Sequence, residues 1–193
     1  MIRIDANEVP PQPWMNGGGW TRELLLWPLG APDWQLRISV ATISGPGPFS
    51  RFPGVHRAFA VVSGAGLTLR IDGREHSQQV ETEPCHFSGE AEVFATPLAG
   101  TTHDLNLMYR TGRGAIRRVV DDNPWISAAS QRGLFAGVAG KFTIGANAPL
   151  LLAAHTLMWM EQSSGAAWHF SAQVSDSRLP AWWLEYSPSP NWR

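Results

Sequence analysis

Short stretches of alternating apolar and polar residues dominate the chain. In the clearest one, apolar side chains occupy the even positions from Trp34 to Val40, and Gln35, Arg37 and Ser39 lie between them. Because successive side chains of a strand point to opposite faces, this alternation predicts a strand with one buried face. Similar stretches predict strands at 20–26, 34–43, 57–62, 66–71, 102–110, 115–120, 150–160, 166–174 and 181–186. Many short strands separated by Gly and Pro are typical of an all-β sandwich or barrel.

Turn and cap residues divide this pattern further. Asp72-Gly73 separates two strand-like runs and predicts a tight type I′ hairpin. The segment 121–133 offers Asp or Asn as a cap, Pro124 in the first turn and Gly133 as a stop, which predicts one short helix. No charged linker interrupts the chain, so we expect one compact domain over 1–193 with two β-rich lobes, approximately 1–113 and 114–193.

Composition narrows the class of protein. The chain has 193 residues, a formal net charge of −1 and 44% apolar residues, which excludes a disordered protein. Basic residues are balanced by acidic ones and are scattered, so we expect no nucleic-acid partner. The single Cys85 has no second Cys for a disulfide or a zinc site.

The N-terminus gives an expectation about location. It has no basic region followed by an apolar stretch, and no run in the chain approaches the ~18 to 20 apolar residues of a membrane span. We therefore expect a cytoplasmic protein without a membrane partner.

Three stretches carry a family pattern. They are the string W-M-N-G-G-G-W-T-R-E at 14–23, the segments 37–41 and 47–57, and D-L-N-L-M-Y-R at 104–110. In type and order they resemble the HutD/Ves family of bacterial cupin-like proteins. The resemblance implies a cupin-like double-stranded β-helix, or jelly roll, with two barrel lobes as in a bicupin. For HutD-type members it also implies a link to histidine utilisation.

The glycine string has two interpretations. Asn16 precedes Gly17, Gly18 and Gly19, and three glycines permit positive φ angles and a close approach of the backbone to a partner. They form either a turn into the following strand or a loop whose N–H groups bind an anion. No G-x-G-x-x-G pattern is present, so a dinucleotide site is not expected.

Polar residues on two neighbouring strands predict either a cavity or a solvent-facing surface. Thr21 and Glu23 share one face of their strand, and Arg37 and Ser39 share one face of the next. Inside a barrel, Glu and Arg must pair with each other or with a ligand. Spacing alone leaves both interpretations open.

Histidine spacing argues against a metal or other cofactor. Metal-binding cupins usually carry two His two residues apart before a Glu, and one further His in a second motif. The segment 49–57 lacks the first motif, whereas 97–103, which ends in His103, resembles the second. Stable sites commonly use three or more protein ligands, so we expect none here. His103 is instead a candidate acid or base, and Asp104 and Asn106 share one strand face as candidate ligand contacts.

These features favour a binding protein for a small carboxylate. The predicted cavity is lined by 14–23, 37–41, 49–57 and 104–108, with Arg37 or Arg57 pairing with the carboxylate. Its expected ligand contacts are Asn16, Gly17, Gly18, Gly19, Thr21, Glu23, Arg37, Ser39, Phe49, Arg57, Asp104 and Asn106. The resemblance implies urocanate, formylglutamate or formate as ligand, and a metabolite sensor or regulator in histidine or amino-acid catabolism.

Two other functions stay open. One is a metal-independent isomerase or hydrolase acting on a small acid, with Glu23, His103 or Asp104 as acid/base groups. The other is a partner-binding protein, such as a homodimer, whose interface contains Trp182, Trp183 and Trp192.

Overall fold

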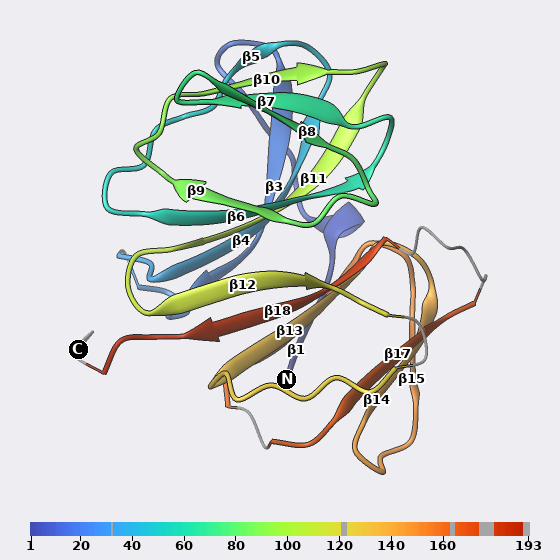
Figure 1. The fold of residues 1–193 in the computed structure, drawn as a ribbon. Coiled ribbons are helices and arrows are strands. Elements are labelled where there is room, and N and C mark those ends of the chain that lie inside the picture. The colour runs from blue at the N-terminus through green and yellow to red at the C-terminus, as the bar shows by residue number, and fades with distance from the viewer. Residues whose placement is uncertain (32, 121–122, 163–164, 174–179, 191–193) are drawn as a thin grey trace.

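The computed structural model describes residues 1–31, 33–120, 123–162, 165–173 and 180–190 as four antiparallel β-sheets (Figure 1). A six-stranded sheet has the order β2 (Gln12–Pro13), β3 (Gly19–Trp27), β4 (Leu36–Ile43), β11 (Thr102–Tyr109), β6 (His56–Ser63) and β9 (Cys85–Ser88). A four-stranded sheet has the order β5 (Gly47–Pro48), β10 (Val93–Pro97), β7 (Leu67–Ile71) and β8 (Arg74–Gln78). These two sheets form the first barrel.

The second barrel is built from the two remaining sheets. Its larger sheet has the order β1 (Ile2–Asp5), β16 (Thr156–Met160), β13 (Gln131–Ala136), β18 (Ala181–Ser187) and β12 (Arg113–Arg118). Its smaller sheet has the order β15 (Leu150–Leu152), β14 (Gly140–Ile144) and β17 (Trp168–Ala172). Apart from the 3-10 turn η1 (Ala6–Glu8), the described residues contain no helix, so the all-β prediction is confirmed and no helix there is long enough to cross a membrane.

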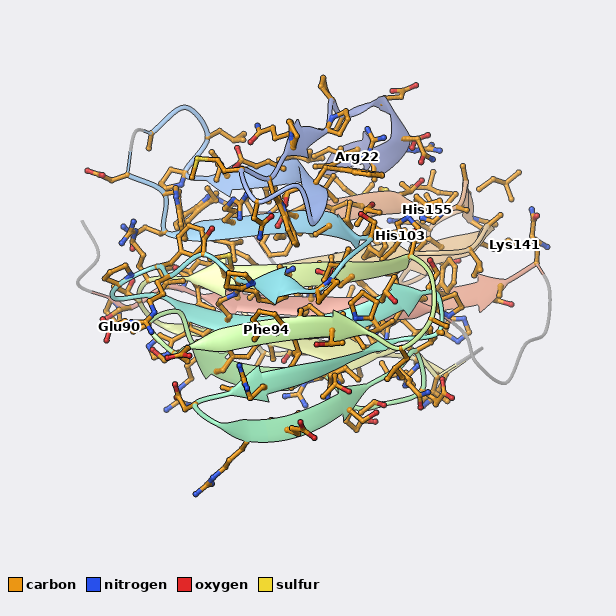
Figure 2. The ribbon with its side chains drawn as sticks, turned by 90° about the horizontal axis from the view of Figure 1, so that it is seen from above. Arg22, Glu90, Phe94, His103, Lys141 and His155 are labelled. Carbon is orange, nitrogen blue, oxygen red and sulfur yellow. The ribbon has the colours of Figure 1, made fainter. Side chains whose placement is uncertain are left out.

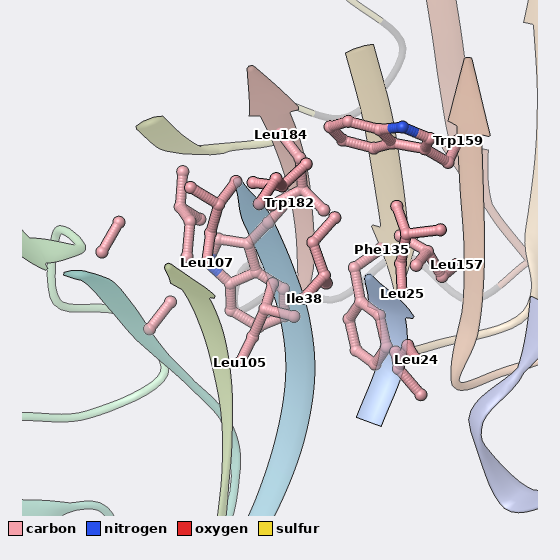
Figure 3. Close-up of a cluster of buried hydrophobic side chains, with 14 of the residues drawn as sticks. Leu24, Leu25, Ile38, Leu105, Leu107, Phe135, Leu157, Trp159, Trp182 and Leu184 are labelled. Carbon is pink, nitrogen blue, oxygen red and sulfur yellow. The ribbon is translucent and has the colours of Figure 1, made fainter. Parts of the chain in front are cut away.

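The six- and five-stranded sheets pack face to face through the largest apolar cluster (Figure 3). Leu36 and Ile38 of β4 and Leu105 and Leu107 of β11 meet Trp182 from the other sheet there, and all five are fully buried. The apolar face of the predicted alternation therefore lies between the two barrels. The polar face of the same strands must point into the first barrel.

A bulge in β3 adjusts this alternation. The register between β3 and β4 shifts between Glu23 and Leu25, so Leu24 and Leu25 both contribute to the cluster between the sheets (Figure 3). A bulge places two residues opposite one, which allows two consecutive side chains to face the same core. Without it, one of these leucines would point toward the interior of the first barrel.

The N-terminal strand crosses from one half of the chain to the other. β1 pairs with β16, with Ile2 opposite Trp159 and Asp5 opposite Thr156. Its residues belong to the predicted lobe 1–113, but it lies in the five-stranded sheet of the second barrel (Figure 1). The two barrels therefore share a core, and a strand from the N-terminus completes the larger sheet of the second barrel.

Some local predictions hold and others fail. Asp72 and Gly73 have φ angles of 46° and 82° between the paired strands β7 and β8, which confirms the type I′ hairpin. The helix predicted at 121–133 is wrong for its described part, because Trp125 forms an extended bridge to Trp168 and Gly133 lies inside β13. Residues 121–122 lie outside the described part of the chain.

The predicted tryptophan interface is also wrong where it can be checked. Trp182 and Trp183 are 0% and 2% exposed and contribute to the cores on opposite faces of β18. Trp192 lies outside the described residues. The predicted strand 150–160 is in fact two strands, β15 and β16, separated by a turn at His155.

Candidate functional site

The first barrel contains a cavity of about 420 Å³. Its floor is the polar face of β4, β6 and β11, and its rim is formed by the segments around β2 and β5. It is lined by Gln12, Pro13, Trp14, Met15, Asn16, Thr21, Arg37, Ser39, Ala41, Pro48, Phe49, Ser50, Phe52, Arg57, Asp104, Asn106 and Met108. Segments distant in sequence therefore meet at one polar pocket.

Strand register arranges the floor of the cavity in rows. Arg37 and Arg57 both lie opposite Met108 of the central strand β11, one on each side. Ser39 lies opposite Asn106 in the next row. Because the strands are antiparallel neighbours, this register brings two guanidinium-bearing residues to the same end of the cavity floor.

Arg57 is the most deeply buried cation of the cavity. Only 7% of it is exposed, and its Nη2 donates a 2.8 Å hydrogen bond to Asn106 Oδ1. Its guanidinium carbon lies 4.9 Å from the ring centre of Phe49 and 5.0 Å from that of Phe87. Its buried Nε has no hydrogen-bond partner in the structure. A buried donor without a partner is costly, so this atom is prepared for an acceptor.

Asn106 connects Arg57 to a buried carboxyl group. Its Nδ2 donates a 2.5 Å hydrogen bond to Asp104 Oδ1, whereas Asp104 Oδ2 is buried without a partner. Burial raises the pKa of Asp104 to about 8, against the opposing effects of the nearby Arg57 charge and the Asn106 hydrogen bond. Burial likewise lowers the pKa of Arg57 to about 10, which leaves it charged at neutral pH.

Arg37 is held by a different carboxylate. Its Nε donates a 2.8 Å hydrogen bond to Glu23 Oε2 in an ion pair, and its Nη1 lies 3.5 Å from Met108 Sδ. Glu23 itself does not line the cavity. The ion pair with Glu23, outside the cavity lining, thus orients the Arg37 side chain.

Charge balance gives the cavity a positive character. Arg37 and Arg57 both line it, and Arg37 is close enough to lower the pKa of Arg57. Glu23 neutralises one of these charges, while Asp104 with a pKa of about 8 is mostly protonated at pH 7. One net positive charge remains next to an unpartnered donor, which favours an anion.

Apart from the glycines, the residues expected from sequence divide into three groups. Those lining the cavity are Asn16, Thr21, Arg37, Ser39, Phe49, Arg57, Asp104 and Asn106. Glu23 reaches the cavity only through Arg37. His103 lines a separate cavity, because it and Asp104 are successive residues of β11 and point to opposite faces. The three proposed acid/base groups therefore do not share one site.

Gly17, Gly18 and Gly19 do not line the cavity. They instead allow the backbone turn that leads into β3. Gly17 has a φ angle of 71°, and its N–H donates to the carbonyl of Trp14. The Gly18 N–H donates to Asn16 Oδ1 at 3.0 Å. A Cβ on Gly19 would lie 2.0 Å from the Thr42 carbonyl oxygen. The geometry corresponds to the turn interpretation, so we do not retain the glycine N–H groups as ligand donors.

Three lining residues lie outside the four segments that the sequence predicts to line the cavity. Gln12, Pro13 and Pro48 belong to the two-residue strands β2 and β5, which are too short to produce an alternating pattern. Within the described part of the chain, no cluster of three or more His, Cys, Asp or Glu side chains is arranged to hold a metal ion.

The fold and cavity define a class of protein: a two-barrel, cupin-like β protein with a polar, cation-lined pocket in its first barrel. The cupin 2 conserved barrel domain protein from Leptotrichia buccalis has a similar fold, with a TM-score of 0.55 at 7% identity and 96% of each chain covered. The cupin-like fold prediction is thus confirmed.

The family follows from the sequence comparison. The HutD family model matches residues 6–178, and the chain belongs to the HutD family. Protein Ves from Citrobacter koseri is 32% identical over 171 residues, covering 88% of this chain and 83% of the relative. An uncharacterised 21.2 kDa protein of Pseudomonas putida, named for the hutC 3′ region, is 36% identical over 111 residues, covering 57% and 58%. The structure of HutD from Pseudomonas fluorescens SBW25, described as a formate condition, has a TM-score of 0.80 at 23% identity, covering 97% and 98%.

Proposed function

We propose that this protein binds a small carboxylate in the cavity of its first barrel and acts in the cytoplasm as a metabolite sensor or regulator of amino-acid catabolism. The observation that carries the proposal is Arg57, a buried, charged side chain that lines the cavity with its Nε unpartnered. A planar guanidinium offers parallel N–H donors that match the two oxygens of a carboxylate.

The neighbouring groups define how the ligand is held. One carboxylate oxygen accepts a hydrogen bond from Arg57 Nε, and Arg37 supplies the second positive charge. Protonated Asp104 donates a hydrogen bond from its Oδ2 to the ligand carboxylate. The bound carboxylate in turn favours the protonated form of Asp104. Trp14, Phe49 and Phe52 line the same cavity and contact an apolar or planar body of the ligand.

Two relatives support the choice of ligand class. HutD from Pseudomonas fluorescens was described in a formate condition, and the Pseudomonas putida relative is named for the hutC 3′ region. We therefore propose formate, urocanate and formylglutamate as the acids to test first.

Calorimetric titration of these three acids tests the proposal. Arg57→Met and Arg37→Met should each weaken binding by about 1.5–3 kcal/mol, roughly ten- to a hundredfold. Arg70→Met is the matched control, because Arg70 lies exposed on β7 of the same barrel and does not line the cavity. Unchanged thermal melting of each variant separates loss of binding from loss of fold. If no acid binds the wild-type protein, or if all four proteins bind equally, the assignment is wrong.

A metal-independent enzyme is the second candidate, favoured by one observation. Asp104 lines the cavity with a pKa of about 8, a value suited to proton transfer near neutral pH. Incubating the three acids with the protein at pH 7 to 9 and following them by mass spectrometry and proton NMR distinguishes the two functions. A sensor returns them unchanged, whereas turnover that Asp104→Asn abolishes identifies an enzyme.

A further inference from the structure

A second cavity, of about 230 Å³, lies at one end of the space between the two barrels. It is lined by Ala6, Asn7, Trp20, Arg22, Val40, Ala41, Thr42, Val62, Ser63, His103, Phe135 and His155. Arg22 and Thr21 are neighbours on β3 that line different cavities, so the two pockets lie on opposite faces of the same sheet. Ala41 is the single lining residue that the two pockets share.

Three basic side chains converge on this second cavity without a carboxylate. Arg22 comes from β3, His103 from β11 and His155 from the turn before β16 (Figure 2). They are the only titratable side chains among the described residues that line it, and Asn7, Thr42 and Ser63 supply further hydrogen-bonding groups. A pocket with cationic donors and no acidic partner is complementary to an anion.

His103 is oriented by a neighbouring hydroxyl. Its Nδ1 lies 3.0 Å from Ser63 Oγ on the adjacent strand β6. When Ser63 donates to Nδ1, the ring proton of neutral His103 is on Nε2, and in the charged ring Nε2 also carries a proton. Burial, and secondarily the nearby His155, lowers the pKa of His103. An anion bound between the two rings would raise the pKa of His103.

His155 occupies its position at a cost in backbone strain. Its φ angle is 61°, in the left-handed region, which is uncommon for any residue other than Gly although Asn, Asp and His adopt it more often than the rest. Its carbonyl oxygen accepts a 2.9 Å hydrogen bond from the Ala6 N–H, which fixes the turn against η1. Such strain costs roughly 1–3 kcal/mol and is found at functional sites more often than elsewhere.

Arg22 gives the cavity a permanent charge. One of its Nη1 hydrogens is donated to the carbonyl oxygen of Val9, which holds the side chain along the N-terminal segment. A fixed guanidinium next to two imidazoles repels a metal cation, so these histidines are poorly placed for metal binding. The same combination is suited to a tetrahedral oxyanion, which accepts hydrogen bonds from several directions.

We propose that this inter-barrel cavity is a second ligand site, which binds a phosphate-class oxyanion, either free phosphate or a phosphate monoester, through Arg22, His103 and His155. The site is independent of the carboxylate site proposed above, because it uses the opposite face of the six-stranded sheet. Its two histidines come from different barrels, so the bound anion bridges them.

Calorimetry with inorganic phosphate, glycerol phosphate and sulfate tests this site on the full chain. We expect one saturable site per chain. His155→Asn removes the imidazole while keeping a residue that tolerates positive φ, and it should weaken binding about tenfold or more, as should Arg22→Met. Sulfate keeps its charge between pH 6 and pH 8, so tighter sulfate binding at pH 6 than at pH 8 reports proton uptake by the protein rather than by the ligand. Tighter binding of phosphate or of glycerol phosphate identifies the free ion or the ester as the source, and either result supports the site.

Two controls locate the binding. His76→Gln changes an exposed histidine on β8 and should leave phosphate binding unchanged. Arg57→Met removes the main cation of the first cavity and should also leave it unchanged, whatever becomes of carboxylate binding. Proton NMR of the His103 and His155 rings should show both resonances moving with phosphate. Absence of saturable binding, or binding that Arg57→Met abolishes and His155→Asn does not, would overturn the proposal.

Discussion

Replacing Asp104 by Asn should remove a specific dependence of stability on pH. The native carboxyl has a pKa of about 8 against an ordinary value of 3.8, so between these values the folded chain holds a proton that the unfolded chain has released. The free energy of unfolding therefore falls as pH rises through this window, by about 1.4 kcal/mol per pH unit. An amide at position 104 does not titrate, so the variant lacks this slope.

The size of the effect follows from the same window. Over the two pH units from 5 to 7, the wild-type protein should lose about 2.7 kcal/mol relative to Asp104→Asn. Below pH 3.8, where the carboxyl is protonated in both states, the two proteins should be similar in stability, because the amide oxygen of the variant can still accept the hydrogen bond that Asn106 Nδ2 donates to Asp104 Oδ1 in the wild type. Above pH 8 the difference should become constant, since the carboxyl is then ionised in both states.

Urea unfolding followed by tryptophan fluorescence, at half-unit steps from pH 5 to pH 9, measures this difference. Other groups, such as His86 and His103 with pKa values lowered by burial, affect both proteins equally and cancel. Glu75→Gln provides the control, because Glu75 is an exposed carboxylate on β8. If the stability difference between wild type and Asp104→Asn stays flat over this range, Asp104 does not hold a proton in the folded chain and the proposed donor to the ligand is lost.

Further predictions concern the glycine turn and metal content. Gly19→Ala should lower the melting temperature by several degrees, because its Cβ would lie 2.0 Å from the Thr42 carbonyl oxygen, whereas Gly45→Ala should melt like wild type because nothing lies within 4 Å. Equal melting of the two variants would contradict this close approach. Elemental analysis of dialysed protein should find no stoichiometric iron, manganese, nickel or zinc; a reproducible one-to-one content would contradict this expectation.

The sequence was most informative where one physical rule acts alone. Alternation around Trp34 to Val40 predicts both faces of β4, and the positive φ values at Asp72 and Gly73 follow from turn chemistry. The sequence was least informative where tertiary contacts determine the conformation of a segment. The cap residues around 121–133 favour a helix. In the structure, however, the chain is extended at Trp125, which stacks on Trp183 with ring centres 4.8 Å apart. Local propensity cannot anticipate such a distant partner.

The candidate site shows the same division. The polar residues of long strands were visible as cavity candidates because strand periodicity groups them. Residue spacing does not predict whether those polar faces are buried or exposed to solvent, because their burial depends on the four-stranded sheet that covers them. His155 gave no signal at all, since its importance rests on a turn conformation and on the approach of His103 from the other barrel.

The pairing of β1 with β16 affects how the chain folds during its synthesis. Ile2–Asp5 emerge from the ribosome about 150 residues before their partners in β16, Thr156–Trp159. Until then the buried face of β4, with Leu36 and Ile38, has no second sheet to cover it. Contacts of such high sequence separation form slowly, so the nascent first barrel exposes an apolar surface for most of its synthesis. A fragment ending near residue 113 would leave that apolar surface uncovered, so we expect such a fragment to aggregate.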